Sequence, residues 1–526
     1  MAVVGSKTIL GLGCALVLAL GGCTGQIQPD PTTPTTPTAP TAPSAPTAPV
    51  SVPLPNPADP LPASQVAAFS GIASLNAGSN CTGTLIDTGV PSGPAYVLTN
   101  GHCVGDVGRS AQATTLSQEW AGTADFLALS GHLDEKLSVD VVGLEYSTMR
   151  HTDTAIVRLK PTLGELQDLG LRAVKITEAE PDAGASVVNI GVPVQDLPVD
   201  GWVLRRGECK LGAQHTLIEH LWLWFGVWSN NCPGIIQGSS GSPLLTLDAD
   251  GNPTAVVAMI NTTTWAATAA NGGECFLNRP CEVTEERVGM QEQTSYAQSV
   301  AGIGKCFTAS GEFELQDGCP LPTSSVWAET GGGSFRGGDL PDAHGQLPAV
   351  SLVGRDEGTV RTKLVPIGDA TACQRAETYA GAASAKLPEA GEEWEQVGVK
   401  VPVDLPEDEG RHLLCAVNGT DYAGAAAVLF EVDRTPPIFP ASAEIEDIGE
   451  GTVLVRPHLN PPDISTVRFT WGAPDAVDCD DTDSFQDFFI VPLFLESTDL
   501  PAKYCVYGLD AAGNRTDVTR IEIPKR

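Results

Sequence analysis

The sequence predicts an all-β protein with a main body followed by two small appended units. In the body, short apolar runs such as 95–98 and 255–260 alternate with turn residues, and helical periodicity is scarce. After residue 345, the stretches 414–432 and 504–523 share the order of a Cys-bearing strand, a turn and a final strand. Apolar residues make up 42% of the chain and charged residues 18%, which excludes a disordered chain and a coiled coil.

The N-terminus has the features of an export signal. Lys7 supplies a positive charge, and the apolar stretch 9–20 is too short to span a bilayer. It runs into Leu-Gly-Gly-Cys, which resembles the lipobox of bacterial lipoproteins. The resemblance implies a signal peptide at 1–22, a lipid anchor on Cys23 and an exported protein of the outer membrane or cell surface. The alternative is an ordinary secretory signal that happens to end in Cys.

A Pro/Thr-rich stalk is expected at 23–62, after the lipidated Cys. Thirteen of the 34 residues at 29–62 are Pro, and between 31 and 49 a Pro recurs at every third position. Polyproline II has three residues per turn, so these rings would line one face of an extended segment. At about 3.1 Å per residue, the stalk would hold the folded body away from the membrane. A recognition motif for a Pro-binding partner is the alternative.

The charge balance excludes one class of partner. The chain has 30 basic and 64 acidic residues, which gives a net charge of −34. Such a surface repels phosphate backbones, so no nucleic-acid partner is expected.

Twelve cysteines remain when Cys14 in the signal and the lipidated Cys23 are set aside from the fourteen. An even count in an exported chain favours disulfides, although spacing alone does not define their connectivity. A zinc site would need closely spaced Cys or Cys/His clusters, and none appears in the sequence. No metal and no cofactor are therefore expected. The simplest set is sequential pairing: Cys81/Cys103, Cys209/Cys232, Cys275/Cys281, Cys306/Cys319, Cys373/Cys415 and Cys479/Cys505.

The body is expected to span 63–325, and Gly-Gly-Gly-Ser at 331–334 to form a flexible joint. The appended units, 345–434 and 435–526, meet near the paired prolines 436–437, which cannot continue a ladder of strands. Both units resemble the small immunoglobulin-like β-sandwiches that follow many exported bacterial proteins. Their partner is not predicted by the sequence.

One segment of the body has the sequence Leu-Trp-Leu-Trp-Phe-Gly-Val-Trp, at 221–228. It is apolar on both faces at period two, which predicts a strand buried on both sides, with its Trp side chains in the core. His215, Glu219 and His220 precede it, at a spacing that fits no metalloprotease motif. They are expected to be ordinary surface or strand residues.

Three short motifs carry candidate catalytic residues: His102 in Leu-Thr-Asn-Gly-His-Cys, Asp153 in Asp-Thr-Ala-Ile-Val, and Ser240 in Gly-Ser-Ser-Gly-Ser-Pro. A hydroxyl is a poor nucleophile at neutral pH, so it needs a nearby base, and that base needs an orienting group. Gly238 and Gly241 permit a tight turn around Ser240. This turn would aim the N–H groups of Gly238 and Ser240 at a developing oxyanion.

These motifs, in the order His, Asp, Ser, resemble those of the trypsin-like, chymotrypsin-fold serine peptidases. The resemblance covers about 65–325 and includes the Cys pair beside the His. It implies a double β-barrel with the active site between the barrels. It also implies that Ser240 attacks a peptide carbonyl, that His102 is the base, and that Asp153 orients His102. Cys81 and Cys103 would form the bridge beside the His.

The sequence also departs from this family. Zymogen-activated members have an Asp where Ser239 stands, and no Ile-Val-Gly-Gly occurs near residue 70, so we expect activity without that cleavage. By the resemblance, Gly234 lies at the floor of the substrate pocket, with Asn261 and Thr262 on its wall. No acid stands at the position of Gly234, so the sequence does not support a preference for basic substrates.

The sequence as a whole predicts a membrane-anchored, exported serine endopeptidase acting on peptide or protein substrates. The alternative is a catalytically inactive binding or adhesion lipoprotein that has kept a peptidase-like domain.

Overall fold

The computed structural model describes residues 55–525 except 105–113, 221, 266–274, 276, 285–287, 324, 329–333, 337–348, 355–357, 368–369, 388–396, 404, 450, 459–463 and 489–491. The chain divides into two units, 1–48 and 49–526, and the second holds every described residue. The predicted signal peptide, Cys23, most of the predicted stalk and the glycines at 331–333 lie outside the described residues. In the part that is described, no helix has the length and apolar character needed to cross a membrane.

The first half of the body is a closed barrel of six antiparallel strands in the order β2-β3-β4-β7-β6-β5. Its strands are β2 (Ile72–Asn76), β3 (Asn80–Leu85), β4 (Pro94–Thr99), β5 (Thr114–Phe126), β6 (Leu137–Thr148) and β7 (Thr154–Thr162). The short helix α1 (Leu163–Asp168) follows, capped by the side chain of Thr162, which accepts from the N–H of Glu165. Alternating apolar side chains such as Leu75, Val97 and Val157 fill the barrel.

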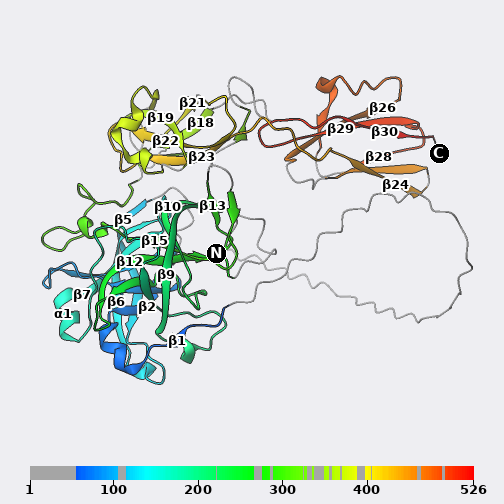
Figure 1. The fold of residues 1–526 in the computed structure, drawn as a ribbon. Helices are drawn as coiled ribbons and strands as arrows, with labels where there is room; N and C mark the ends of the chain where they lie inside the picture. The colour runs from blue at the N-terminus through cyan, green and yellow to red at the C-terminus, as the bar shows by residue number, and fades with distance from the viewer. Residues whose placement is uncertain are drawn as a thin grey trace, which may run out of the picture. The chain divides into compact units, whose positions relative to one another are not determined.

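The second half of the body is also a closed barrel. Strands run in the order β10-β15-β12-β11-β8-β9, and β9 pairs with β10 to close the ring. The body is therefore the expected chymotrypsin-like double β-barrel, whose strands can be followed in Figure 1. The strands are β8 (Ser186–Gly191), β9 (Arg205–Glu219), β10 (Trp222–Asn230), β11 (Pro243–Leu247), β12 (Pro253–Thr263) and β15 (Ser295–Ser299), with β13 (Cys281–Val283) and β14 (Val288–Met290) added beyond β9.

A hydrophobic cluster joins the two barrels. It contains Leu98 and Ile156 from the first barrel and Val188, Leu245 and Met259 from the second. Because these side chains come from strands that end near the catalytic motifs, their packing fixes the position of one barrel's loops against the other's.

The predicted stalk ends earlier than residue 62. The short strand β1 (Asp59–Pro60) pairs with Arg205 and Arg206 of β9, and the N–H of Leu61 donates to the carbonyl of Leu204. Leu61 is buried in the core between the barrels. A Pro is tolerated in such a two-residue edge strand because its missing N–H can face away from the partner. These residues therefore belong to the peptidase body.

Residues 222–228 lie in strand β10, as predicted, but the strand is not buried on both sides. Trp224 and Trp228 are buried, whereas Trp222 and Phe225 are half-buried. Trp222 and Trp224 line a cavity, so their apolar surface serves its wall rather than the barrel core alone. Sequence periodicity does not distinguish a side chain that packs in a core from one that lines a cavity.

The first appended unit is a β-sandwich. One sheet has the order β16-β18-β21, the other β17-β23-β22-β19-β20, and the two share one hydrophobic core. Since β16 and β17 belong to these sheets, the unit begins before the predicted residue 345. Its strands are β16 (Val326–Ala328), β17 (Ser334–Phe335), β18 (Ala349–Gly354), β19 (Gly358–Pro366), β20 (Ala383–Leu387), β21 (Val397–Pro402), β22 (Gly410–Asn418) and β23 (Ala426–Val432).

The second appended unit is also a sandwich, with sheets β24-β25-β28 and β27-β26-β29-β30 around one core. Both units have the immunoglobulin-like layout expected from their Cys-bearing strands, and Figure 1 labels strands of each. The strands of the second unit are β24 (Ala443–Gly449), β25 (Thr452–Pro457), β26 (Thr466–Gly472), β27 (Gln486–Asp487), β28 (Leu493–Leu495), β29 (Ala502–Leu509) and β30 (Thr519–Ile523).

Six disulfides join the cysteines in the sequential order that the sequence suggested. Cross-links of this kind restrict the unfolded chain, which stabilises small domains whose cores are limited. The two in the sandwiches close loops of 42 and 26 residues. The four in the body are Cys81–Cys103, Cys209–Cys232, Cys275–Cys281 and Cys306–Cys319, and the two in the sandwiches are Cys373–Cys415 and Cys479–Cys505.

The bonded cysteines differ in burial, and Cys319 lies in a turn near the surface. Ten of the twelve are buried, whereas Cys275 and Cys319 are half-buried. Cys306 lies inside the core between the barrels, but Cys319 only packs against the edge of that core. The backbone N–H of Cys319 donates to the carbonyl of Gln316, within a turn outside any strand. The disulfide of Cys319 therefore attaches the segment that leaves the second barrel to the core, and Cys319 is not part of the catalytic site.

Candidate active site

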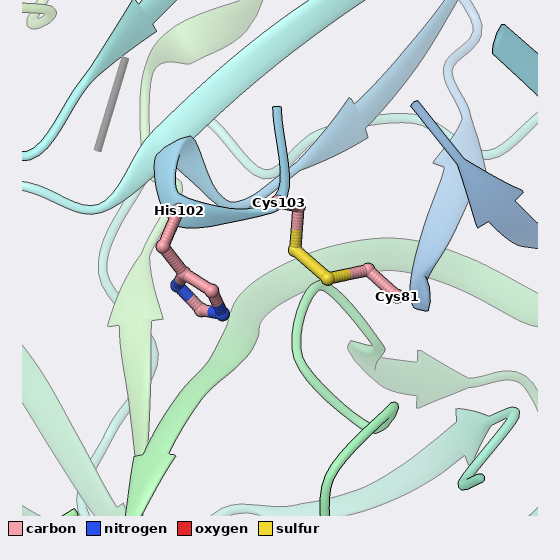
Figure 2. Close-up of side chains that lie close together, drawn as sticks. All are labelled: Cys81, His102 and Cys103. Carbon is pink, nitrogen blue, oxygen red and sulfur yellow. A yellow bond between two sulfur atoms is a disulfide. The ribbon is translucent and has the colours of Figure 1, made fainter. Parts of the chain in front are cut away.

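His102 lies on a short 3-10 turn (Gly101–Cys103) directly after strand β4. Cys103 on the same turn is bonded to Cys81 on β3, and Figure 2 shows this disulfide beside the imidazole. Cys81, His102 and Cys103 have the proximity of a metal site, but both sulfur atoms are used in the disulfide. A disulfide offers no thiolate to a metal, so this group instead anchors the His-bearing turn to the barrel.

Asp153 immediately precedes β7 and is completely buried. Its Oδ2 lies 2.7 Å from Nδ1 of His102, and its Oδ1 accepts a hydrogen bond of 3.1 Å from the backbone N–H of His102. Asn100 Nδ2 donates to the carbonyl of Asp153 at 2.9 Å. Both carboxylate oxygens therefore bind the same residue. This arrangement fixes the imidazole and favours the tautomer that carries its proton on Nδ1.

The electrostatics of the pair raise the pKa of His102. Burial, the largest single cause, lowers this pKa, because a charged imidazolium loses water. The charge and the hydrogen bond of the Asp153 carboxylate, together with the charge of Glu219, outweigh burial and raise the pKa. Nε2 of His102 consequently binds a proton more strongly than a free imidazole does.

This shift predicts the pH dependence of catalysis. A general base must be neutral, and His102 is protonated below its raised pKa, so kcat/KM should increase with pH through a midpoint above 6.5. The measurement is kcat/KM between pH 4 and pH 9. Glu219→Gln removes one charge that raises this pKa and should move the midpoint to lower pH. A midpoint below 6.5 in the wild type would contradict the assignment of His102 as the base.

Ser240 lies in a tight turn between β10 and β11, flanked by two glycines with left-handed backbone. Gly238 has a φ of 96° and Gly241 a φ of 81°, which only glycine adopts without strain. Thr82 of the first barrel holds the turn: its N–H donates to the carbonyl of Ser240 at 2.8 Å, and its Oγ1 to that of Gly238 at 2.9 Å. The Ser-bearing loop of one barrel is thereby hydrogen-bonded to a strand of the other.

The N–H groups of Gly238 and Ser240 suit the predicted oxyanion role. Within the described residues, neither N–H donates a hydrogen bond to the protein. The carbonyl of Gln237, which precedes them, accepts from the N–H groups of Val194 and Gln195 and is thus engaged elsewhere. Two free N–H donors in one turn are the arrangement that stabilises a developing oxyanion.

A cavity of about 520 Å³ brings the predicted residues together. His102, Ser240, Asn261 and Thr262 all line it, whereas Gly234 does not. Gly234 packs against the segment at 57–58 instead, where a Cβ would lie 2.2 Å from the N of Ala58. The placement of Gly234 at the pocket floor is therefore wrong, because the loop before Ser240 takes a different path from the one that the family spacing implies. No hydrogen bond joins Ser240 Oγ to His102 in this structure.

Glu219 is the site residue that the sequence reasoning missed. It ends strand β9, is 3% exposed, and lines the same cavity as Ser240. Burial raises the pKa of its carboxyl, while hydrogen bonds from Thr262 Oγ1 (2.6 Å) and the N–H of Asn278 (2.9 Å) lower it. An acid within the apolar stretch Leu-Ile-Glu-His-Leu-Trp was the available signal, since a carboxylate is almost never buried without a reason.

The double β-barrel with a buried His–Asp pair, a Ser-bearing turn and two free N–H groups at one cavity is the architecture of the chymotrypsin-fold serine hydrolases. Residues 81–259 match the family described as the trypsin-like peptidase domain, and this range contains His102, Asp153 and Ser240. This part of the chain belongs to the trypsin-like serine peptidase family and makes the protein a serine endopeptidase. The Cys306–Cys319 bridge lies beyond the matched range.

Two solved structures are similar to this chain. A thermostable serine protease, AL20, from an extremophilic microorganism has 15% identity and a TM-score of 0.30, covering 45% of this chain and 94% of its own. Protease Anisep from Arthrobacter nicotinovorans has 15% identity and a TM-score of 0.27, covering 45% of this chain and 92% of its own. No curated protein matches the chain.

Proposed function

We propose that the protein is an exported, membrane-anchored endopeptidase that hydrolyses peptide bonds through an acyl-enzyme on Ser240. The observation that carries this proposal is the shared cavity, in which the Asp153-oriented His102 and the glycine-flanked turn of Ser240 meet. The lipobox-like sequence ending at Cys23 and the Pro-rich stalk support the anchor.

In the proposed reaction, Ser240 Oγ attacks the peptide carbonyl carbon while Nε2 of His102 takes its proton. The N–H groups of Gly238 and Ser240 stabilise the oxyanion, and His102 then gives the proton to the departing amine as the C–N bond breaks. Water attacks the acyl-enzyme with His102 again as base, which releases the acid and restores Ser240. Asp153 stabilises the imidazolium in both halves of the cycle.

Activation by cleavage near residue 70 has no place in this proposal. Phe69, Ser70 and Ile72 are buried, and Ile72 pairs with Thr84 in the first barrel. Ser239 offers no carboxylate to a new N-terminus, since its hydroxyl accepts from the N–H of Ile236.

The absence of a Ser240–His102 hydrogen bond favours one alternative, an inactive binding lipoprotein. Labelling of the full chain with a fluorophosphonate probe, followed by peptide mapping, distinguishes the two. We expect the probe to modify Ser240 and no other Ser of its turn, because only an activated hydroxyl displaces the fluoride. Labelling of the folded protein, but not of the urea-unfolded protein, is the control. An unlabelled wild type, or equal labelling of Ser240→Ala, would instead support the binding protein.

A further inference from the structure

The active-site cavity contains a buried carboxylate that forms no ion pair with a Lys or Arg among the residues that the structure describes. Glu219 is 3% exposed, and its two hydrogen bonds come from uncharged donors, the hydroxyl of Thr262 and the N–H of Asn278. Within the described part of the chain, Glu219 forms no ion pair with a Lys or Arg. A buried carboxylate is costly without a compensating charge, and each oxygen still has a lone pair to offer.

Two further polar groups of the same cavity lack partners. The side chain of Asn261 is 4% exposed, and neither its Oδ1 nor its Nδ2 finds a hydrogen-bond partner among the described residues. The indole N–H of Trp222 is likewise buried without a partner there. Both residues line the cavity with Glu219. Buried polar atoms are nearly always satisfied in native proteins, so these unpartnered groups indicate a ligand. Asn261 Oδ1 can accept a hydrogen bond from a cationic side chain, whereas the N–H groups of Asn261 and Trp222 can donate only to acceptors such as the carbonyl oxygens of a peptide.

The aromatic wall of the cavity suits a flat cation. The rings of Trp222 and Trp224 are stacked, with centroids 5.7 Å apart and planes inclined by 9°. Indole faces are the strongest aromatic partners of guanidinium groups, and they also cover its apolar stem.

Another part of the cavity lining is held in place by a disulfide. Asn278, which donates to Glu219, lies between Cys275 and Cys281, which form a disulfide. The N–H of His220 donates to the carbonyl of Cys275 at 2.6 Å, so strand β9 and this loop are joined directly beside Glu219. The site is therefore formed before any ligand arrives, which lowers the entropic cost of binding.

We propose that this cavity is a specificity site for an arginine side chain of the substrate, close to the scissile bond, with Glu219 as its anionic partner. The proposal rests on the proposed peptidase function. The guanidinium donates to the free lone pairs of the Glu219 carboxylate and to Asn261 Oδ1, and it lies against the Trp222 ring. Arginine fits better than lysine because its five donors in a plane match acceptors on two separate side chains.

This site differs from the pocket floor that the family spacing suggested. Position 234 holds a glycine outside the cavity, so the acid comes from the end of strand β9 rather than from the loop before Ser240. A preference for a basic side chain is thus compatible with the absence of an acid at position 234.

The test uses pairs of peptides that differ only in arginine against citrulline, its neutral isostere, at each of four positions on the acyl side of the cleaved bond. With concentrations normalised by fluorophosphonate titration, we expect kcat/KM for one arginine position to exceed that of its citrulline partner by ~30-fold or more, the effect of a desolvated charge pair. Glu219→Gln should bring this ratio close to one. The matched control is Glu208→Gln on the same strand, where the side chain is exposed and pairs with Arg206; it should keep the wild-type ratio.

Each outcome has a separate meaning. Wild-type ratios within about threefold at all four positions would overturn the proposal without any variant, and so would a Glu219→Gln ratio equal to the wild type's. A lysine peptide with the same kcat/KM as the arginine peptide would overturn the assignment of a guanidinium to this site. Failure of the probe to label Ser240 would instead overturn the proposed peptidase function, so the two failures are distinguishable.

Discussion

Asp153→Asn is expected to lower kcat about 10⁴-fold. Asp153 Oδ2 accepts the Nδ1 proton of His102 at 2.7 Å, and Oδ1 accepts from the backbone N–H of the same residue. The side-chain amide of the Asp153→Asn variant would donate to Nδ1, so the imidazole would carry its proton on Nε2. A protonated Nε2 cannot accept the proton of Ser240. The backbone carbonyl of Asp153, held by Asn100, is unaffected, so the turn should keep its conformation.

The positioning role of Asp153 has a second readout. Its carboxylate raises the pKa of His102, so Asp153→Asn should also move the acidic midpoint of kcat/KM to lower pH. Asp140→Asn is the control, because Asp140 is exposed and pairs with Lys160 on the barrel surface; both readouts should stay at wild-type values. A decrease in kcat of less than tenfold, or an unchanged acidic midpoint of kcat/KM, would contradict the role assigned to Asp153.

The parts of the site that the sequence predicts are those with local signatures. His102, Asp153 and Ser240 each stand in a short motif whose neighbours are required by geometry. Asn100 holds Asp153, Cys103 anchors the His-bearing turn, and Gly238 permits the turn around Ser240. Asn100 and Cys103 stand within two residues of His102, and Gly238 within two residues of Ser240, so these motifs can be found in the sequence without knowing the fold.

Glu219 shows why the rest of the site could not be predicted. It is 21 residues from Ser240, and its partners Thr262 and Asn278 come from other segments. Its role depends on how β9, β10 and β12 pair around the second barrel, which no local pattern encodes. The short strand β1 could not be predicted for the same reason. Asp59 and Pro60 continue the composition of the stalk, and only their pairing with β9 separates them from it.

The prediction that Gly234 forms the pocket floor was wrong for a related physical reason. Counting back from Ser240 assumes that the loop after Cys232 follows the family's path. Here that loop packs on the N-terminal segment, and Gly234 has a φ of 71° against Pro57 and Ala58. Sequence spacing measures chain length, whereas the identity of a pocket depends on the path of the chain.

Gly241→Ala is expected to destabilise the peptidase body by about 2–5 kcal/mol and to reduce kcat/KM by ~100-fold or more. A Cβ on Gly241 would lie 2.1 Å from the carbonyl oxygen of Thr82 and 2.4 Å from Oγ1 of Thr99. Neither atom can yield easily, because Thr82 holds the turn of Ser240 and Thr99 Oγ1 donates to the carbonyl of Thr82. The new methyl group would therefore push the turn away from the first barrel and displace Ser240 from His102.

Gly251→Ala separates this steric effect from backbone strain. Gly251 has a φ of 82°, almost the value at Gly241, but a Cβ there would meet no atom within 4 Å. Its substitution should cost only the strain of a left-handed alanine, about 1–2 kcal/mol, with kcat/KM unchanged. Urea unfolding followed by tryptophan fluorescence gives the stabilities, and steady-state kinetics give the activities. Equal losses in the two variants would mean that contact between the barrels does not hold Ser240 in position, because strain alone would then explain both.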